Sequence, residues 1–276
     1  LLSLIAFGDR QKAFLSALVL LTSVLYIGLS RTVFTDMIFS VLILLALLSF
    51  FWGYRYKNRR SIGVVLFFIF SALAVLTKGP LGVVMPAACV CLYLILRRDL
   101  RFLFHRSSIA GIIIFSVLAL PWYIQMWRLY GKFFIDEFFY NCHIRRIFEA
   151  EHPSNNKWYF YPLSAIGCMF PWSFVTLSGL GLLIKEIKKK ERLDANLFLA
   201  LWIVSMFLIF QFAASKLVSY IFPFFPALAI LSGNFLGDIL GKKNFLRQVL
   251  PISALVIVLA LLILPFVIFI ALKIYP

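Results

Sequence analysis

The sequence predicts an all-α membrane protein, a polytopic bundle of transmembrane helices with one large outer loop. Three observations lead to this fold class. Hydrophobic residues make up 63% of the 276 positions, and the mean hydropathy is +0.99, far above the roughly half-apolar composition of soluble domains. The apolar residues form runs of the length that crosses a bilayer, which takes roughly 20 residues. The basic residues gather in every second link between these runs.

Nine runs are long enough, or nearly so, to be transmembrane spans of a single domain that covers residues 1–276. The chain opens inside a further apolar run, at residues 1–7, so we expect an internal piece of a longer protein that lacks a first span and a first outer loop. The nine expected spans are 13–29, 36–53, 62–77, 81–97, 109–127, 161–184, 197–213, 219–240 and 249–272.

The charge of the links predicts which side of the membrane each of them faces. The net charge is +16, and 18 of the 27 basic residues lie in alternate links. Basic links stay on the cytoplasmic side, so the charge reports topology, and nucleic acid is not an expected partner. The basic links carry Arg10 and Lys12; Arg55, Lys57, Arg59 and Arg60; Arg97, Arg98, Arg101 and Arg106; Lys185, Lys188, Lys189, Lys190 and Arg192; and Lys242, Lys243 and Arg247.

Two polar clusters lie at the outer ends of the earlier spans. In the first, a helix begins at Thr35 and Asp36: either Thr35 caps it and Asp36 complements the positive end of its dipole, or Asp36 is a catalytic or substrate-positioning carboxylate. In the second, Lys78 precedes Gly79-Pro80, a helix start whose free N–H groups can bind a phosphate. The alternative for Lys78 is an ordinary lysine that extends its ammonium to the interface.

Two further clusters follow on the same side. Lys216 and Tyr220 are four residues apart, so on a helix they share a face and can hold one phosphate oxygen; alternatively both are interface anchors. The large loop, about 128–158, is rich in polar and aromatic residues suited to a sugar or a headgroup. It contributes Asn141, His143, Arg146 and His152. Its histidines lack a recognised metal-ligand spacing, so we assign no metal site, although a divalent metal requirement stays open.

These clusters belong to a longer ordered series of short motifs between about residue 20 and about residue 235. The series runs Arg31-Thr-Val-Phe-Thr-Asp-Met37, Leu76-Thr-Lys-Gly-Pro80, Pro121-Trp-Tyr123, Phe138-Phe-Tyr-Asn-Cys-His-Ile-Arg-Arg146, His152-Pro153, Tyr159-Phe-Tyr-Pro162, Pro171-Trp-Ser173 and Lys216-Leu-Val-Ser-Tyr-Ile-Phe-Pro-Phe-Phe-Pro-Ala-Leu-Ala229. It resembles the GT-C membrane glycosyltransferases that use polyprenyl-phosphate sugars, in particular the aminoarabinose transferases of lipid A and the protein O-mannosyltransferase-like family 39.

The resemblance implies transfer of a hexose or pentose from an isoprenoid-phosphate donor to lipid A, a protein or another glycan. It places the reaction on the periplasmic face of a bacterial inner membrane, among membrane lipids. Asp36 matches the family's second acidic position and Lys78 its third-loop lysine. The expected base lies in the loop before Leu1, so this piece alone is expected to be inactive. Ile147 stands where the family motif His-x-x-Arg-Phe has its aromatic residue.

If the resemblance holds, the cations from three separate links should converge on one outer cavity. Lys78, Arg146, Lys216 and Tyr220 would face the donor phosphate, with Asp36 on another wall. The alternative function is a multi-pass transporter or flippase of a lipid-linked or anionic substrate. Transporters place ionisable residues near the middle of the bilayer, and the middles of these spans have none.

Overall fold

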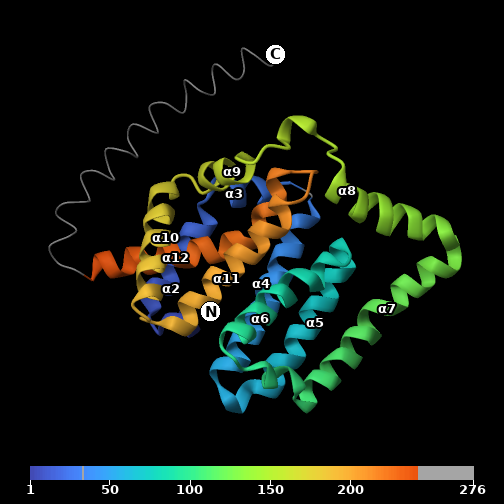
Figure 1. Ribbon diagram of the computed structural model, residues 1–276. Coiled ribbons are helices and arrows are strands. Elements are labelled where there is room, and N and C mark those ends of the chain that lie inside the picture. The colour runs from blue at the N-terminus through green and yellow to red at the C-terminus, as the bar shows by residue number, and fades with distance from the viewer. Residues whose placement is uncertain (33, 242–276) are drawn as a thin grey trace.

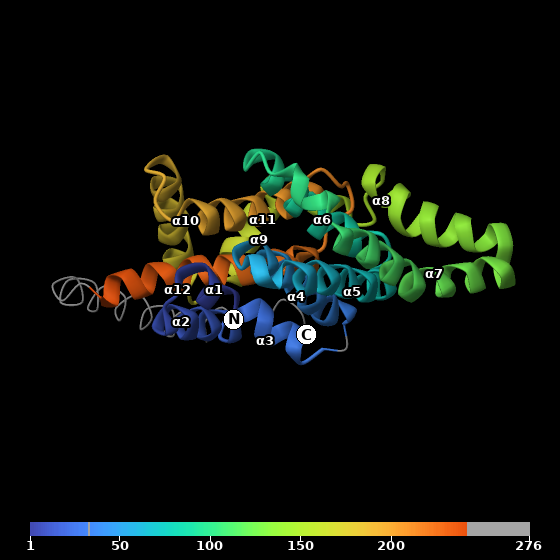
Figure 2. The same ribbon diagram turned by 90° about the horizontal axis from the view of Figure 1, so that it is seen from below.

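The computed structural model describes residues 1–32 and 34–241, and its regular elements there are all helical (Figures 1 and 2). This confirms the predicted all-α bundle. The α-helices are α1 (Leu2–Phe7), α2 (Arg10–Leu21), α3 (Val24–Ser30), α4 (Thr35–Arg55), α5 (Arg60–Lys78), α6 (Leu81–Leu96), α7 (Arg106–Phe134), α8 (Arg145–Phe148), α9 (Phe160–Cys168), α10 (Ser173–Lys188), α11 (Leu193–Gln211) and α12 (Phe225–Leu240). Short 3-10 helices are η1 (Lys57–Arg59), η2 (Leu100–Phe104), η4 (Pro153–Asn155) and η5 (Val218–Phe224), and η3 (Ile135–Ile144) is a π-helix.

The spans are less regular than the apolar runs predict. Within the described residues, five helices are long and apolar enough to cross a membrane, or up to seven if each bent pair counts as one span. The expected span 13–29 is α2 and α3, bent by 63°, and the expected span 161–184 is α9 and α10, bent by 114°. The span expected at 81–97 is the short helix α6, and the one expected at 249–272 lies outside the described residues.

The large loop is also more helical than expected. Helix α7 continues to Phe134, changes direction at Gly131 (φ 54°), and passes into η3 and α8. No proline occurs between Pro121 and Pro153 to remove a backbone N–H from these helices, and the change of direction falls at a glycine. Figure 1 shows α7 and α8 as an arm on one side of the bundle, with α8 returning toward the ends of α5 and α6.

Close helix packing in the bundle depends on small residues. Helices α4 and α5 make the largest contact in the fold, and they touch at Gly53 and Gly63. A Cβ added at Gly63 would lie 2.6 Å from the Gly53 Cα and from the Ser49 carbonyl oxygen. Small residues at such crossings are the usual way for membrane helices to gain van der Waals contact, because lipid offers little hydrophobic driving force. This glycine contact lies beside the short α4–α5 link, and the Asp36–Lys78 ion pair joins the same two helices at their other ends.

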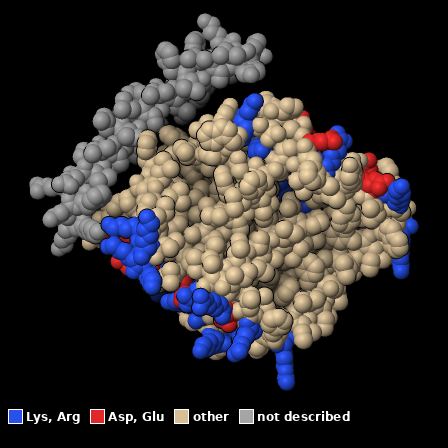
Figure 3. Space-filling model, in the orientation of Figure 1, with Lys and Arg blue, Asp and Glu red and all other residues tan. Residues whose placement is uncertain are grey.

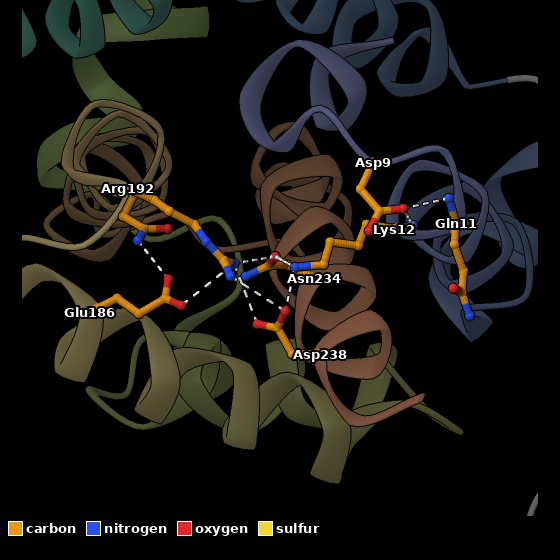
Figure 4. Close-up of polar contacts among 8 residues, drawn as sticks. Asp9, Gln11, Lys12, Glu186, Arg192, Asn234 and Asp238 are labelled. Carbon is orange, nitrogen blue, oxygen red and sulfur yellow. Dashed lines mark hydrogen bonds and ion pairs between the residues drawn. The ribbon is translucent and has the colours of Figure 1, made fainter. Parts of the chain in front are cut away.

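A buried polar network joins α2, the α10–α11 link and α12 at the other end of the bundle (Figure 4). The Lys12 ammonium donates to Asn234 Oδ1 at 3.0 Å and pairs with Asp238. Arg192 bonds the same two residues, with 3.0 Å to Asn234 Oδ1 and 3.3 Å to Asp238 Oδ2, and lies 3.5 Å from Glu186. Each buried charge therefore has an opposite partner, which burial requires.

The basic links gather on one side of the molecule. In Figure 3, Lys and Arg side chains follow its lower edge, where Figure 1 shows the α4–α5 and α10–α11 links. The turn between α5 and α6 and the return of α8 lie toward the opposite edge. The fold therefore keeps the two classes of link apart. The chain is an integral membrane protein, and its described basic links share one face; the link with Lys242, Lys243 and Arg247 lies outside the described residues.

Candidate active site

One cavity of about 540 Å³ opens where the N-terminal end of α4 and the C-terminal ends of α5 and α11 meet the large loop. Apolar side chains form most of its wall, while charged and hydroxyl groups occupy part of it. The polar lining is Asp36, Lys78, His143, Arg146, Ser215 and Tyr220; the apolar lining includes Phe39, Leu81, Val84, Phe138, Ile147, Ile209, Phe210, Phe212 and Pro223. Four separate stretches of sequence thus contribute to one site.

Asp36 and Lys78 form an ion pair across the α4–α5 contact. Asp36 lies in the first turn of α4 and is 6% exposed, and Lys78 ends α5. Helix α4 has no side-chain cap, and its N-cap residue is Phe34, so the capping role considered for Thr35 and Asp36 is not what the structure shows. The carboxylate is directed at Lys78, and it leaves the N–H groups of its own helix uncapped.

Lys78 sits between two aromatic rings inside the cavity. Its Nζ lies 5.1 Å from the Tyr220 ring centroid and 5.6 Å from that of Phe39. A cation at this distance from an aromatic face is attracted by the ring quadrupole. The turn that follows, at Gly79 (φ 77°) and Pro80, leads into α6. The ammonium is therefore held in place by one carboxylate and two rings.

Arg146 approaches the same cavity from the large loop. Its Nη1 donates to the Tyr220 hydroxyl at 3.1 Å, and its Nη2 lies 2.8 Å from Glu151. The Arg146 Nε is buried and has no hydrogen-bond partner among the described residues. Lys78, Arg146 and Tyr220 are therefore brought together, as the sequence led us to expect.

Lys216 does not join them. Its ammonium donates to Asn156 Oδ1 at 2.8 Å and to the Ala213 carbonyl at 2.7 Å, and the residue is 3% exposed. Burial lowers the pKa of this ammonium. Residues 213–217 are not helical, so the four-residue spacing to Tyr220 does not put the two side chains on one helix face. Lys216 instead ties the large loop to the α11–η5 link.

Of the other predicted loop residues, one lines the main cavity and two do not. His143 lines the main cavity, whereas Asn141 lines a second cavity of about 250 Å³ and donates to Glu137 Oε1 at 2.9 Å. His152 is exposed and lines neither of these cavities. The second cavity shares Cys142 and Arg146 with the first, and its other lining residues are Glu137, Asn141, Arg145, Glu149, Ala150 and Glu151.

Sequence reasoning missed several lining residues, among them Ser215 and Phe138. Ser215 adjoins the predicted Lys216, and Phe138 opens a motif that the resemblance already used, so proximity to these motifs was the available signal. The apolar wall from Ile209, Phe210 and Phe212 gave no separate signal, because apolar residues at the end of a span are expected. Over the described part of the chain, no group of three or more His, Cys, Asp or Glu could hold a metal ion.

Known proteins resemble this chain in sequence and in fold. The model of the dolichyl-phosphate-mannose-protein mannosyltransferase family matches residues 2–134. A protein from Aquifex aeolicus without an assigned function is 31% identical over 236 residues, covering 86% of this chain and 45% of its own length. The undecaprenyl phosphate-alpha-4-amino-4-deoxy-L-arabinose arabinosyl transferase of Aeromonas salmonicida is 29% identical over 248 residues, covering 86% and 43%.

The fold is shared with a solved structure. The crystal structure of ArnT from Cupriavidus metallidurans bound to undecaprenyl phosphate matches with a TM-score of 0.81 at 23% identity, over 96% of this chain and 48% of that chain. The apo structure of the same protein matches with a TM-score of 0.78. The chain spans slightly less than half the length of these relatives. In fold, and over these stretches of sequence, the chain is similar to the GT-C membrane glycosyltransferases.

Proposed function

We propose that this chain is the donor-binding membrane portion of a glycosyltransferase that takes its sugar from an isoprenoid phosphate. One observation carries the proposal: a largely apolar cavity brings the cations Lys78 and Arg146 together with the Tyr220 hydroxyl. An isoprenoid phosphate needs both kinds of surface, because its tail stays in hydrocarbon while its phosphate stays polar. The relatives whose names include undecaprenyl phosphate support the same donor class.

The chemistry assigned to the cations follows from charge. When the sugar leaves, negative charge grows on the leaving phosphate, and preorganised cations in a partly dehydrated site stabilise that charge. Asp36 holds Lys78 in our proposal, so its carboxylate serves the donor side. Activation of the acceptor hydroxyl then requires another carboxylate, which the family resemblance places before Leu1. The acceptor that we propose is a lipid, and the sugar is a pentose or a hexose.

The position of the charges also favours an enzyme over the transporter alternative. Asp36 lies in the first turn of α4 and Lys78 in the last turn of α5. Transporter sites usually lie near the bilayer midplane, in broken helices, whereas these residues occupy helix ends. The basic links gather at the other end of the bundle (Figure 3). We therefore place the reaction on the outer face, periplasmic in a bacterial inner membrane.

The thiol of Cys142 provides a direct test of donor binding. Cys142 is exposed and lines both cavities. In the full-length protein in lipid nanodiscs, with the other cysteines replaced, undecaprenyl phosphate should slow its reaction with a water-soluble thiol reagent by about tenfold. Undecaprenol, which has the tail without the phosphate, should slow it far less. A cysteine at position 58, in the basic α4–α5 link, is the matched control and should react equally with and without either lipid.

Equal reaction rates at Cys142 with and without undecaprenyl phosphate would contradict the proposal. A transfer assay with a radiolabelled isoprenoid-phosphate sugar then tests the second part of it. The full-length protein should move the label to a lipid acceptor, and an assay that shows movement of the intact donor across the bilayer, without transfer of its sugar, would support the transporter alternative.

A further inference from the structure

Residues 143–147, which we call the outer bridge, form one wall of the cavity between two fixed parts of the bundle. At one end, His143 contacts the turn that follows α5. At the other end, two backbone bonds attach the bridge to the α11–η5 link. Ser215 N–H donates to the Arg146 carbonyl at 3.0 Å, and Ala214 N–H donates to the Ile147 carbonyl at 2.9 Å. The bridge is therefore held at both ends, with Arg146 near its middle.

The His143 ring makes two contacts that each require a proton on nitrogen. Its Nδ1 lies 2.6 Å from the Phe138 carbonyl oxygen, and its Nε2 lies 3.2 Å from the Lys78 carbonyl oxygen. Carbonyl oxygens only accept, so each contact is a hydrogen bond when the ring nitrogen concerned carries a proton. The first bond fixes the ring within the π-helix η3, and the second joins the loop to the residue that carries the donor-site ammonium.

The glycine at position 79 leaves room for this ring. A Cβ added there would lie 2.6 Å from His143 Nε2 and 2.9 Å from Cε1. The Phe138 ring also packs against His143, with centroids 4.9 Å apart. The imidazole therefore occupies the space that a side chain at position 79 would need, and its contact with the Lys78 backbone is closely packed on two sides.

We infer that His143 is a positioning residue that holds Lys78 and Arg146 against the same donor phosphate. Through the Lys78 carbonyl it fixes the turn after α5, and through the outer bridge it fixes Arg146, three residues away. The inference rests on the proposed function, because it needs a donor phosphate between the two cations. It adds a role for a residue whose ring contacts backbone oxygens rather than the reacting atoms.

A purely structural role makes a different prediction. His143 also satisfies one of the last carbonyls of α5, and a donor at a helix C-terminus stabilises the helix in its own right. If that were its whole function, removing the ring would lower the melting temperature and leave the donor KM unchanged in the protein that remains folded. A positioning role predicts a higher donor KM in folded protein, with a smaller change in kcat.

The experiment compares three variants of the full-length protein. His143→Leu removes both bonds, and His143→Gln keeps an amide donor of similar reach. Tyr140→Leu is the matched control, because Tyr140 belongs to the same π-helix, is exposed and lines neither cavity. We expect His143→Leu to raise the donor KM by about tenfold or more, His143→Gln to recover at least half of the loss on a logarithmic scale, and Tyr140→Leu to match the wild type.

The rate of trypsin cleavage at Arg145 and Arg146 reports how firmly the large loop is held, independently of turnover. We expect faster cleavage in His143→Leu than in Tyr140→Leu. Faster cleavage with an unchanged donor KM would overturn the inference and leave the proposed function standing. A wild-type protein in which undecaprenyl phosphate fails to protect Cys142 would instead overturn the proposed function, and the inference with it.

Discussion

The carboxylate of Asp36 is paired with the ammonium of Lys78, which joins the first turn of α4 to the last turn of α5 across 42 positions of sequence. The pair is largely shielded from solvent, and it lies in the wall of the main cavity. Removing one partner of such a pair leaves an uncompensated charge in a poorly solvated place. A bound phosphate would supply a second negative charge to the same ammonium, so Lys78 would pair with both the Asp36 carboxylate and the donor phosphate.

Replacing Asp36 with Asn should lower the activity of the full-length enzyme by about tenfold to a hundredfold, because Lys78 loses the group that orients it. A capping role would cost at most about 2 kcal/mol of stability and preserve activity. The measurement is kcat/KM in protein of matched expression and melting temperature. Asp194→Asn is a suitable control, because Asp194 pairs with Arg97 at the basic end of the bundle. An Asp36→Asn enzyme with normal activity would contradict the assignment.

The two outer lysines should respond differently to substitution. Lys78→Met removes a cation from the cavity and should cost roughly 2–4 kcal/mol of transition-state stabilisation, a rate loss of about thirtyfold to a thousandfold. Lys78→Arg should restore part of the rate. Lys216→Met should mainly lower thermal stability, since Lys216 does not line the cavity and its ammonium is bonded to Asn156 and to the Ala213 carbonyl. Equal losses of kcat/KM in both methionine variants would be evidence against the separation of their roles.

The energetic coupling between Gly79 and His143 can be measured by a double-mutant cycle. Gly79→Ala introduces backbone strain and also a contact at 2.6 Å with the imidazole. His143→Leu changes the second contact and leaves the strain in place. We therefore expect the combined variant to lose less donor affinity than the sum of the two single losses, by about 1 kcal/mol or more. Strictly additive losses would show that the two residues act independently.

Lys216 should also make stability depend on pH. Burial lowers its pKa in the folded protein, so between the folded and the unfolded value the unfolded chain binds more protons. The free energy of unfolding should therefore rise as the pH rises through that interval. Chemical unfolding of the wild type and of Lys216→Met from about pH 8 to about pH 11 tests this. The wild type should show the steeper rise, and parallel curves would argue against it.

Topology can be checked with single cysteines at two exposed positions, Asn58 and Ser154, in a background without native cysteines. The basic link that contains Asn58 should face the cytoplasm, and the loop that contains Ser154 should face outside. A membrane-impermeant reagent added to intact cells should label position 154 and reach position 58 only after the membrane is opened. Labelling of both positions in intact cells would overturn the sidedness and the proposed location of the reaction.

The sequence was most informative about the features of the fold that depend on composition. Apolar length and basic links predicted a helical membrane bundle, since both follow directly from the cost of placing polar groups in hydrocarbon. It was less informative on helix shape: the runs 13–29 and 161–184 each predict one span, whereas the helices bend at Thr22-Ser23 and between Cys168 and Ser173, a stretch that contains Pro171. Hydropathy reports burial in lipid, and it carries no information about the direction of the helix axis.

The site divides along similar lines. The structure brings Lys78, Arg146 and Tyr220 together, as predicted, because motifs at the same end of a small helix bundle lie close to one another. Lys216 was misplaced, because the four-residue rule holds only within a helix and residues 213–217 are not helical. The partner of Asp36 could not be predicted, because 42 residues separate it from Lys78 and only the α4–α5 packing brings them together.

The polar network at the basic end has a consequence for biogenesis. Lys12 enters the membrane early in synthesis, yet its partners Asn234 and Asp238 are made more than two hundred residues later. Gly237, whose missing side chain makes room for the stem of Lys12, arrives with them. Until then, this ammonium must be solvated by water or headgroups at the bilayer edge. Insertion of α12 therefore supplies the partners of Lys12, and a chain that ends before residue 234 leaves this ammonium without them.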